Sequence, residues 1–208
     1  SKINKKSLET LNVTGKIIET GNLIFSENIE NNFKKKKKIT YAVTSKRLPA
    51  LQVHGVEYYF EFYSNLQKLN ELSKKKNYQI IVHLHPGIKN NLSNFQKIFK
   101  NLTFTSGDIS KSLKQSFLTI SYSSTVIEDS LYNKIPVVLL DLHKKKYVHF
   151  ECERDPMKTD KAMYYIDETA KLESCIETIN KSKNIPFDDY IYLNKTKKNI
   201  SKLFQNLI

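Results

Sequence analysis

Three consecutive hydroxyl residues, Ser123, Ser124 and Thr125, stand between an apolar run at 117–120 and a segment with apolar residues at helical spacing. The run is typical of a buried strand, and the segment after the hydroxyls is typical of a helix. A helix that begins near Ser124 would leave its first N–H groups unpaired, and its dipole favours an anion there. With the hydroxyls as further donors, this turn predicts a phosphate site. Glu128, one helical turn after Ser124, can rise beside that site. The spacing from Thr125 to Glu128 also fits a capping box, so these residues could serve only to cap the helix. A helix cap and an anion site can occupy the same turn.

His85 is a second candidate for chemistry. It follows the strand-like segment 78–84, and Pro86 and Gly87 end that strand with a turn. Because the carboxyl ends of parallel strands meet at one edge of a sheet, we expect His85 on the same rim as Ser123. An imidazole there could donate a hydrogen bond to a phosphate or protonate a departing one. A polar residue that merely ends a strand is the alternative.

Two other groups could bind a ligand. His83 shares a strand face with His85, but no Asp, Glu or Cys companion stands nearby, so we expect no metal site. Ser45, Lys46 and Arg47 follow an apolar strand and form a second plausible phosphate site. An ordinary polar loop explains these three residues equally well.

The elements that must position these residues alternate in type. We expect strands at 39–43, 78–84, 102–104, 117–120 and 137–140, with helices at 57–74, 91–100, 109–115 and from near Ser124. This alternation predicts an α/β fold with a doubly wound parallel sheet, Rossmann-like in layout. The sequence has five glycines and no G-x-G-x-x-G motif, which disfavours a dinucleotide site.

The remaining segments are assigned around this core. We expect a short edge strand at 164–166, a helix at 169–182 with Cys175 facing the core, and a closing helix at 188–207. The chain then divides into a lead-in segment (1–37), a Rossmann-like domain (38–182) and a C-terminal helix (183–208) that packs back on the domain.

Composition narrows the classes of partner. The chain has 208 residues, 39% of them hydrophobic, which suffices for one core. The net charge of +13 comes almost entirely from lysine, with Arg47 and Arg154 as the two arginines, so we expect a solvated surface and no nucleic-acid groove. An anionic membrane surface or an acidic acceptor is the alternative.

Cysteine usage and hydropathy address the compartment. The two cysteines make no metal or disulfide pattern, which favours a reducing compartment. No apolar run reaches transmembrane length, and the first residues have no secretory signal, so we expect a cytoplasmic location. The opening residues look like the middle of a longer protein.

The His85-Pro86 pair and the Ser123-Ser124-Thr125 turn together resemble a known group of enzymes. They are similar to motifs in the C-terminal, donor-binding half of GT-B-type glycosyltransferases of bacterial surface polysaccharide synthesis. The sialyl- and Kdo-type transferases of capsule and lipopolysaccharide and the CDP-glycerol glycerophosphotransferases are the families most resembled. The resemblance spans roughly residues 15–182 and includes the lead-in KIIETGN.

The resemblance implies a role for each motif. His85 and the serines would hold the phosphate of a CMP-, CDP- or UDP-linked donor, and Glu128 would contact the ribose. Ser45 and Arg47 would add contacts to the donor phosphate. The family needs no cofactor or metal when protein donors neutralise the phosphate.

The resemblance also implies partners. The acceptor, a saccharide or a lipid-linked saccharide, would bind an N-terminal domain that is missing from this chain and would supply the catalytic base. Such an enzyme could contact the inner membrane face peripherally.

Two alternative functions stay open. The same core resembles the C-terminal half of non-hydrolysing UDP-GlcNAc 2-epimerases, whose phosphate turn reads Ser-Gly-Gly with paired acids further on. Ser123, Glu128 and Asp129 keep that spacing, but Ser124 and Thr125 replace both glycines, which favours the transferase. The second alternative is a catalytically silent module that binds a nucleotide or a polyanion.

Overall fold

The computed structural model describes residues 38–43, 55–86, 92–122, 124–144, 152–191 and 205. Each apolar run expected as a strand in this part of the chain forms one. The strands are β1 (Lys38–Ala42), β2 (Gln79–Leu84), β3 (Leu102–Ser106), β4 (Ser116–Ser121), β5 (Val137–Leu140) and β6 (Met163–Ile166).

All six strands are parallel, and their order across the sheet is β3-β2-β1-β4-β5-β6. This confirms the expected α/β fold with a doubly wound, Rossmann-like sheet. The expected edge strand is β6, which pairs in parallel with β5. The direction of strand succession reverses between β1 and β4, and ligands of open α/β sheets bind beyond the carboxyl ends of the strands at such a point.

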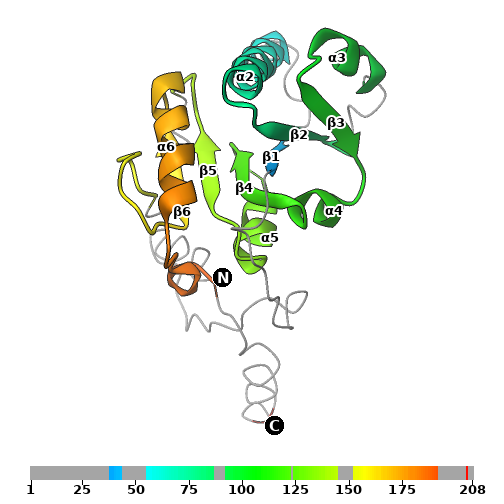
Figure 1. The fold of residues 1–208 in the computed structure, drawn as a ribbon. Helices are drawn as coiled ribbons and strands as arrows, with labels where there is room; N and C mark the ends of the chain where they lie inside the picture. The colour runs from blue at the N-terminus through cyan, green and yellow to red at the C-terminus, as the bar shows by residue number, and fades with distance from the viewer. Residues whose placement is uncertain are drawn as a thin grey trace.

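Helices cover both faces of the sheet (Figure 1). One face carries α2 (Gly55–Lys76), α3 (Leu92–Ile98) and α6 (Thr169–Lys181), and the other carries the short helices α4 (Ile109–Leu113) and α5 (Val126–Tyr132). In the chain, α2 follows β1 and α5 follows β4, so the helices that follow the two strands at the switch point cover opposite faces of the sheet.

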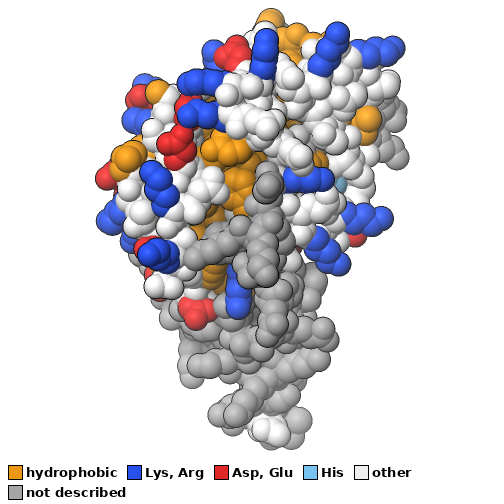
Figure 2. All heavy atoms as spheres, viewed as in Figure 1, with side chains coloured by type: hydrophobic (Ala, Val, Ile, Leu, Met, Phe, Trp, Pro, Cys, Tyr) orange, Lys and Arg blue, Asp and Glu red, His pale blue; other side chains and the backbone are white. Residues whose placement is uncertain are grey.

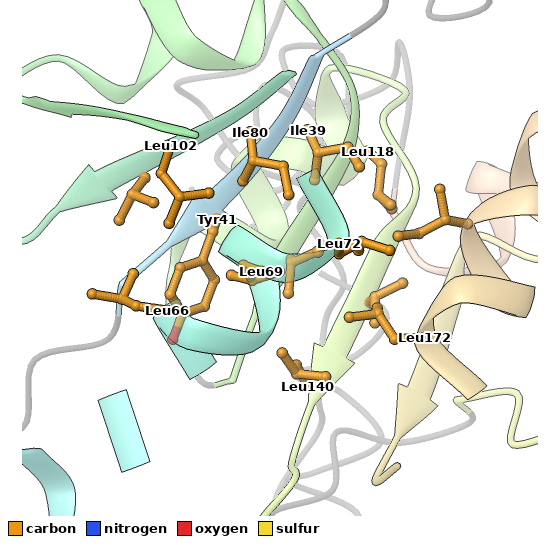
Figure 3. Packing of buried hydrophobic residues seen from close by; sticks show 14 of the residues in the cluster. Ile39, Tyr41, Leu66, Leu69, Leu72, Ile80, Leu102, Leu118, Leu140 and Leu172 are labelled. Atoms are coloured by element: carbon orange, nitrogen blue, oxygen red, sulfur yellow. The ribbon is translucent and has the colours of Figure 1, made fainter. Parts of the chain in front are cut away.

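The larger core fills the space between the sheet and α2, α3 and α6 (Figure 3). Leu66, Leu69 and Leu72 repeat at helical spacing along α2 and are buried, as the apolar stripe predicts. Cys175 lies in the same core and is completely buried, which confirms that it is a packing residue.

Surface charges join the two long helices of this face. The Lys76 ammonium lies 2.7 Å from a Glu173 oxygen and 3.0 Å from a Glu177 oxygen, and Lys75 also contacts Glu173. These pairs connect the end of α2 to α6. Elsewhere the basic side chains are scattered over the visible face and form no continuous groove (Figure 2).

The C-terminal part of the described chain differs from expectation. A helix was expected from residue 188, but residues 187–189 form a single 3-10 turn, η5 (Phe187–Asp189), and Tyr190 and Ile191 are not helical. Phe187, Tyr190 and Ile191 are buried in a second apolar cluster with α5, β5 and β6. The burial of these three side chains determines the path of the backbone here, and the helical spacing of apolar residues in the sequence does not. No helix among the described residues is long and apolar enough to cross a membrane.

Candidate functional site at the carboxyl edge of the sheet

Strand register places the candidate residues at one edge of the sheet. His83 pairs with Ala42, Ala42 with Ser121, and Ser121 with Leu139, so these four residues form one row across the sheet. His85 lies two positions beyond this row on β2, and Ser124 and Thr125 lie three and four positions beyond it after β4. Only β1 separates β2 from β4, which corresponds to two strand spacings, or about 10 Å. The histidine and the hydroxyls therefore share the carboxyl edge, on either side of the switch point.

The turn before α5 is tighter than expected. The helix begins at Val126, and the Ser124 hydroxyl accepts a 3.3 Å hydrogen bond from the Val126 N–H. The next three amides donate to the Ser124 and Thr125 carbonyls at 3.0 to 3.3 Å. The expectation of unpaired N–H groups at the start of this helix is thus wrong for its first four residues, because the turn satisfies them locally. An anion at this turn would instead meet the hydroxyls.

Thr125 has a side chain available for such contact. It occupies the N-cap position, but its side chain makes no capping bond, so a capping box with Glu128 does not form through the Thr125 hydroxyl. The Thr125 side chain is exposed at the edge. Ser124 is half-buried and serves as the local cap.

Glu128 and Asp129 lie in the first turn of α5 and are half-buried. Burial, together with the neighbouring Glu128 carboxylate, raises the pKa of Asp129 above its ordinary value. Two adjacent acids in one helical turn just behind the hydroxyls form the only such pair on α5. The carboxyl groups of Glu128 and Asp129 would contact neutral or positively charged groups of a ligand, because a carboxylate repels a phosphate placed next to it.

The two histidines of β2 differ sharply. His85 is exposed immediately after the strand, next to the exposed Pro86. His83 is buried, with Nδ1 3.1 Å from the Ser112 hydroxyl and Nε2 3.1 Å from the Gly107 carbonyl oxygen. Nε2 must donate to that carbonyl, so Nδ1 accepts from Ser112. Burial lowers the pKa of His83, and the neutral imidazole joins β2 to α4.

Sequence reasoning missed a constellation at the ends of β5 and β6. The carboxylate of Asp141 is buried directly after β5, where it accepts a 2.6 Å hydrogen bond from the Tyr165 hydroxyl. Burial and this bond raise the pKa of Tyr165 above its ordinary value. The Arg154 guanidinium lies 4.9 Å from the centre of the Tyr165 ring, a cation–π contact. Asp141 ends the strand next to β4, two positions beyond the row that contains Ser121, so this cluster borders the hydroxyl turn.

Several predicted residues lie outside the described part of the chain. These are Ser45, Lys46, Arg47, Gly87 and Ser123, and their predicted roles stay predictions. Among the described residues, no group of three or more His, Cys, Asp or Glu side chains could hold a metal ion.

No protein-family model matches this sequence, and no curated protein matches it. Solved structures do match. UDP-GlcNAc 2-epimerase from Methanocaldococcus jannaschii is 18% identical with a TM-score of 0.62, and the match covers 99% of this chain and 60% of that one. The complex of the M. jannaschii enzyme with UDP-GlcNAc and UDP gives a TM-score of 0.63 at 17% identity, covering 99% and 59%. Staphylococcus aureus MnaA with UDP gives 0.57 at 13% identity, covering 98% and 58%.

These likenesses establish the class of fold. The chain shares its Rossmann-like α/β fold with these structures, and it spans about 60% of the length of the M. jannaschii and S. aureus proteins. At these identities the likeness concerns the fold alone.

Proposed function

We propose that this chain is the donor-binding half of a GT-B-type glycosyltransferase. It would transfer a sugar or a polyol phosphate from a nucleotide-activated donor during synthesis of a cell-surface polysaccharide of the capsule, lipopolysaccharide or teichoic-acid kind. The observation that carries the proposal is the shared edge: His85 and the Ser124–Thr125 hydroxyls flank the switch point at the carboxyl ends of β2 and β4. This is where open α/β sheets bind nucleotides.

Each residue has a defined part in the proposed reaction. The hydroxyls of Ser123, Ser124 and Thr125 would donate hydrogen bonds to the donor phosphate. The His85 imidazole would donate a hydrogen bond that stabilises charge developing on this phosphate as the bond to the transferred group breaks. Glu128, half-buried in the first turn of α5, would orient the ribose by accepting hydrogen bonds from the ribose hydroxyls.

Residues outside this turn would complete the site. Ser45 and Arg47 follow β1 in the sequence, and β1 is the strand between β2 and β4; these two residues would add donors to the phosphate. The acceptor and the catalytic base would come from a further domain, since the chain spans about 60% of the M. jannaschii epimerase. The reaction would take place in the cytoplasm, where the acceptor could be held at the inner membrane face.

A second candidate is a UDP-GlcNAc 2-epimerase-like isomerase. Two observations favour it: the matched structures from M. jannaschii are epimerases, and Ser123, Glu128 and Asp129 keep the spacing of the epimerase phosphate turn. A carboxyl group with a raised pKa, such as Asp129, is also suited to move a proton. The replacement of two glycines by Ser124 and Thr125 counts against this candidate.

Nucleotide binding tests the part that both candidates share. The chain is titrated with CMP, CDP, UDP and GDP by calorimetry, with each nucleoside as the control that lacks phosphate. We expect one nucleotide to bind and its nucleoside to bind at least about tenfold more weakly, because the phosphate contacts are lost. Equal affinity for nucleotide and nucleoside would contradict a phosphate site, and absence of binding by all four would contradict the proposal.

Product analysis separates the two candidates. The protein containing this chain and its complementary domain is incubated with UDP-GlcNAc alone, and the sugar released is resolved by chromatography. Conversion to the 2-epimer without an acceptor supports the isomerase and overturns the transferase. Turnover of a nucleotide donor only when a saccharide acceptor is added supports the transferase.

A further inference from the structure

A cavity of about 500 Å³ lies at the end of the sheet opposite to His85 and Ser124. Lys38 and Gln79, with which β1 and β2 begin, both line it. Ile81, Thr103 and Thr105 form its floor on β2 and β3, and α4 forms one wall. This amino-edge cavity is therefore separate from the proposed donor site.

The cavity exists because α4 is too short to cover its face of the sheet. Parallel sheets are normally buried on both faces. The five residues of α4 cover the carboxyl half of β2, where Ser112 contacts His83. The amino end of β2 and the edge strand β3 lie beyond α4, where Gln79 and Thr103 are exposed, while Leu102 and Phe104 on the opposite face are buried.

The lining of the amino-edge cavity is positively charged. Three of its fourteen lining residues are lysines, Lys38, Lys74 and Lys111, and none is acidic. The Lys38 ammonium donates to the Gln115 side chain at 2.7 Å. Within the described chain, Lys74 and Lys111 form no ion pair within 4 Å. The cavity thus offers charge that no acid of the described chain neutralises at close range.

The lining is also rich in neutral donors and acceptors. The side chains of Thr103, Thr105, Asn77 and Gln79 make no hydrogen bond to the described part of the chain, so their polar atoms are available to a ligand. Hydroxyl and amide groups of this kind pair with the hydroxyls of a carbohydrate, since each can both donate and accept. The volume lies within the range of small-molecule sites.

We propose that the amino-edge cavity binds an anionic, hydroxyl-rich ligand of one or two sugar-sized units. Ammonium groups of Lys74 and Lys111 would contact its anionic group, and Thr103, Thr105 and Gln79 would contact its hydroxyls. An acidic saccharide and a polyol phosphate share this chemistry. Neither would displace a nucleotide at the carboxyl edge, because the two sites lie at opposite ends of the strands.

Amide chemical shifts of the full chain measure this binding. The chain, labelled with ¹⁵N, is titrated separately with N-acetylneuraminic acid and with glycerol 3-phosphate, and with N-acetylglucosamine as the neutral control. We expect one or both anions to shift the amides of Thr103, Thr105 and Lys111, and the stronger of the two identifies the source of the anionic group. The neutral sugar should bind at least about fivefold more weakly.

The helix α4 supplies a matched pair of variants. Lys111 lines the cavity, whereas the exposed Lys114, three residues later, does not, and both lie near Asp108. Lys111→Glu should weaken binding of the anion by about fivefold or more, and Lys114→Glu should change it less than about twofold. Thr103→Tyr, at an exposed strand position, should fill the floor of the cavity and remove binding while the remaining amide spectrum keeps its dispersion.

Three results would overturn the proposal. They are equal affinity for the neutral and anionic sugars, equal effects of the two lysine variants, and ligand-induced shifts confined to the carboxyl edge near His85 and Ser124. Shifts that are absent with both anions at millimolar concentration would overturn it as well. Nucleotide binding is measured by the separate calorimetric titration, so failure here is distinguishable from failure of the proposed function.

Discussion

The strand β2 carries two histidines, His83 and His85, in two contrasting regions of the molecule. His83 lies inside the sheet, buried beneath α4, and both of its ring nitrogens are engaged by Ser112 and Gly107. His85 lies only two residues further along, but the strand has ended, and the side chain is exposed at the carboxyl edge. The position of each histidine relative to the end of β2 therefore determines its role. His83, inside the sheet, stabilises the fold, and His85, beyond the strand end, is accessible to a ligand.

The largest expected effect is a difference between His83→Ala and His85→Ala in the free energy of unfolding. His83→Ala leaves Ser112 and the Gly107 carbonyl without their partner and creates a cavity under α4. We expect a loss of about 2–3 kcal/mol in the free energy of unfolding, measured by urea denaturation. His85→Ala, at an exposed position, should change it by less than about 0.5 kcal/mol. Similar losses for both variants would break the distinction.

The Tyr165 hydroxyl stabilises the carboxyl edge of the sheet through a buried hydrogen bond, as His83 stabilises the interior. Tyr165→Phe removes the 2.6 Å hydrogen bond that the hydroxyl donates to the buried Asp141 carboxylate. We expect a loss of about 1.5 kcal/mol in the free energy of unfolding, because the acceptor is charged. The buried tyrosine Tyr41, whose hydroxyl accepts a longer 3.3 Å bond from Asn65, is the matched control, and Tyr41→Phe should cost less. A smaller loss for Tyr165→Phe than for Tyr41→Phe would contradict this reasoning.

The pH dependence of stability sharpens the comparison further. Burial lowers the pKa of His83 in the folded protein below the ordinary 6.5, so the unfolded chain takes up this proton first as the pH falls. The free energy of unfolding should therefore fall below about pH 6.5, by at most about 1.4 kcal/mol per pH unit from this group. His83→Asn, which removes the titrating imidazole, should make this fall in the free energy of unfolding less steep. An unchanged slope in His83→Asn would show that other groups cause it.

The smallest expected effect concerns the local cap. Ser124→Ala removes the hydroxyl that accepts the Val126 N–H, a long bond at 3.3 Å. We expect a loss of about 0.5 kcal/mol in the free energy of unfolding, at the low end for an N-cap. Thr125→Ala, whose hydroxyl makes no capping bond, should cost less. A larger loss for Thr125→Ala would mean that Thr125 is the true cap.

Much of the fold could be predicted because local patterns and global topology agree. Apolar runs gave every strand from β1 to β6, and the stripe of Leu66, Leu69 and Leu72 gave α2. The alternation of strands and helices then leaves few topologies, since crossovers between parallel strands are right-handed. The helix expected from residue 188 does not begin there, because Phe187 and Tyr190 bury their rings in the cluster with α5 and β6, a tertiary effect that periodicity does not contain; residues 192–204 of that expected helix lie outside the described residues.

The candidate site could be predicted only in part. Residues that directly follow strands, such as His85 and Ser124, can be assigned to an edge from the sequence, because strand ends are visible in the pattern. The cluster of Asp141, Tyr165 and Arg154 could not, because it depends on which side chain reaches across from β6 to β5. The start of α5 was misplaced by two residues, because Ser124 bonds to the first amides of the helix through its own hydroxyl and carbonyl.

Nucleotide-induced stabilisation tests the central claim most directly. Thermal unfolding is followed with and without the tightest-binding nucleotide, for wild type, His85→Ala, Ser124→Ala and the control Ser174→Ala on α6. At 100 times its dissociation constant the nucleotide should add about 2.7 kcal/mol to wild type and to the control. Most of this gain should disappear in His85→Ala and Ser124→Ala. Equal gains in all four proteins would contradict a phosphate site between His85 and the Ser124–Thr125 hydroxyls.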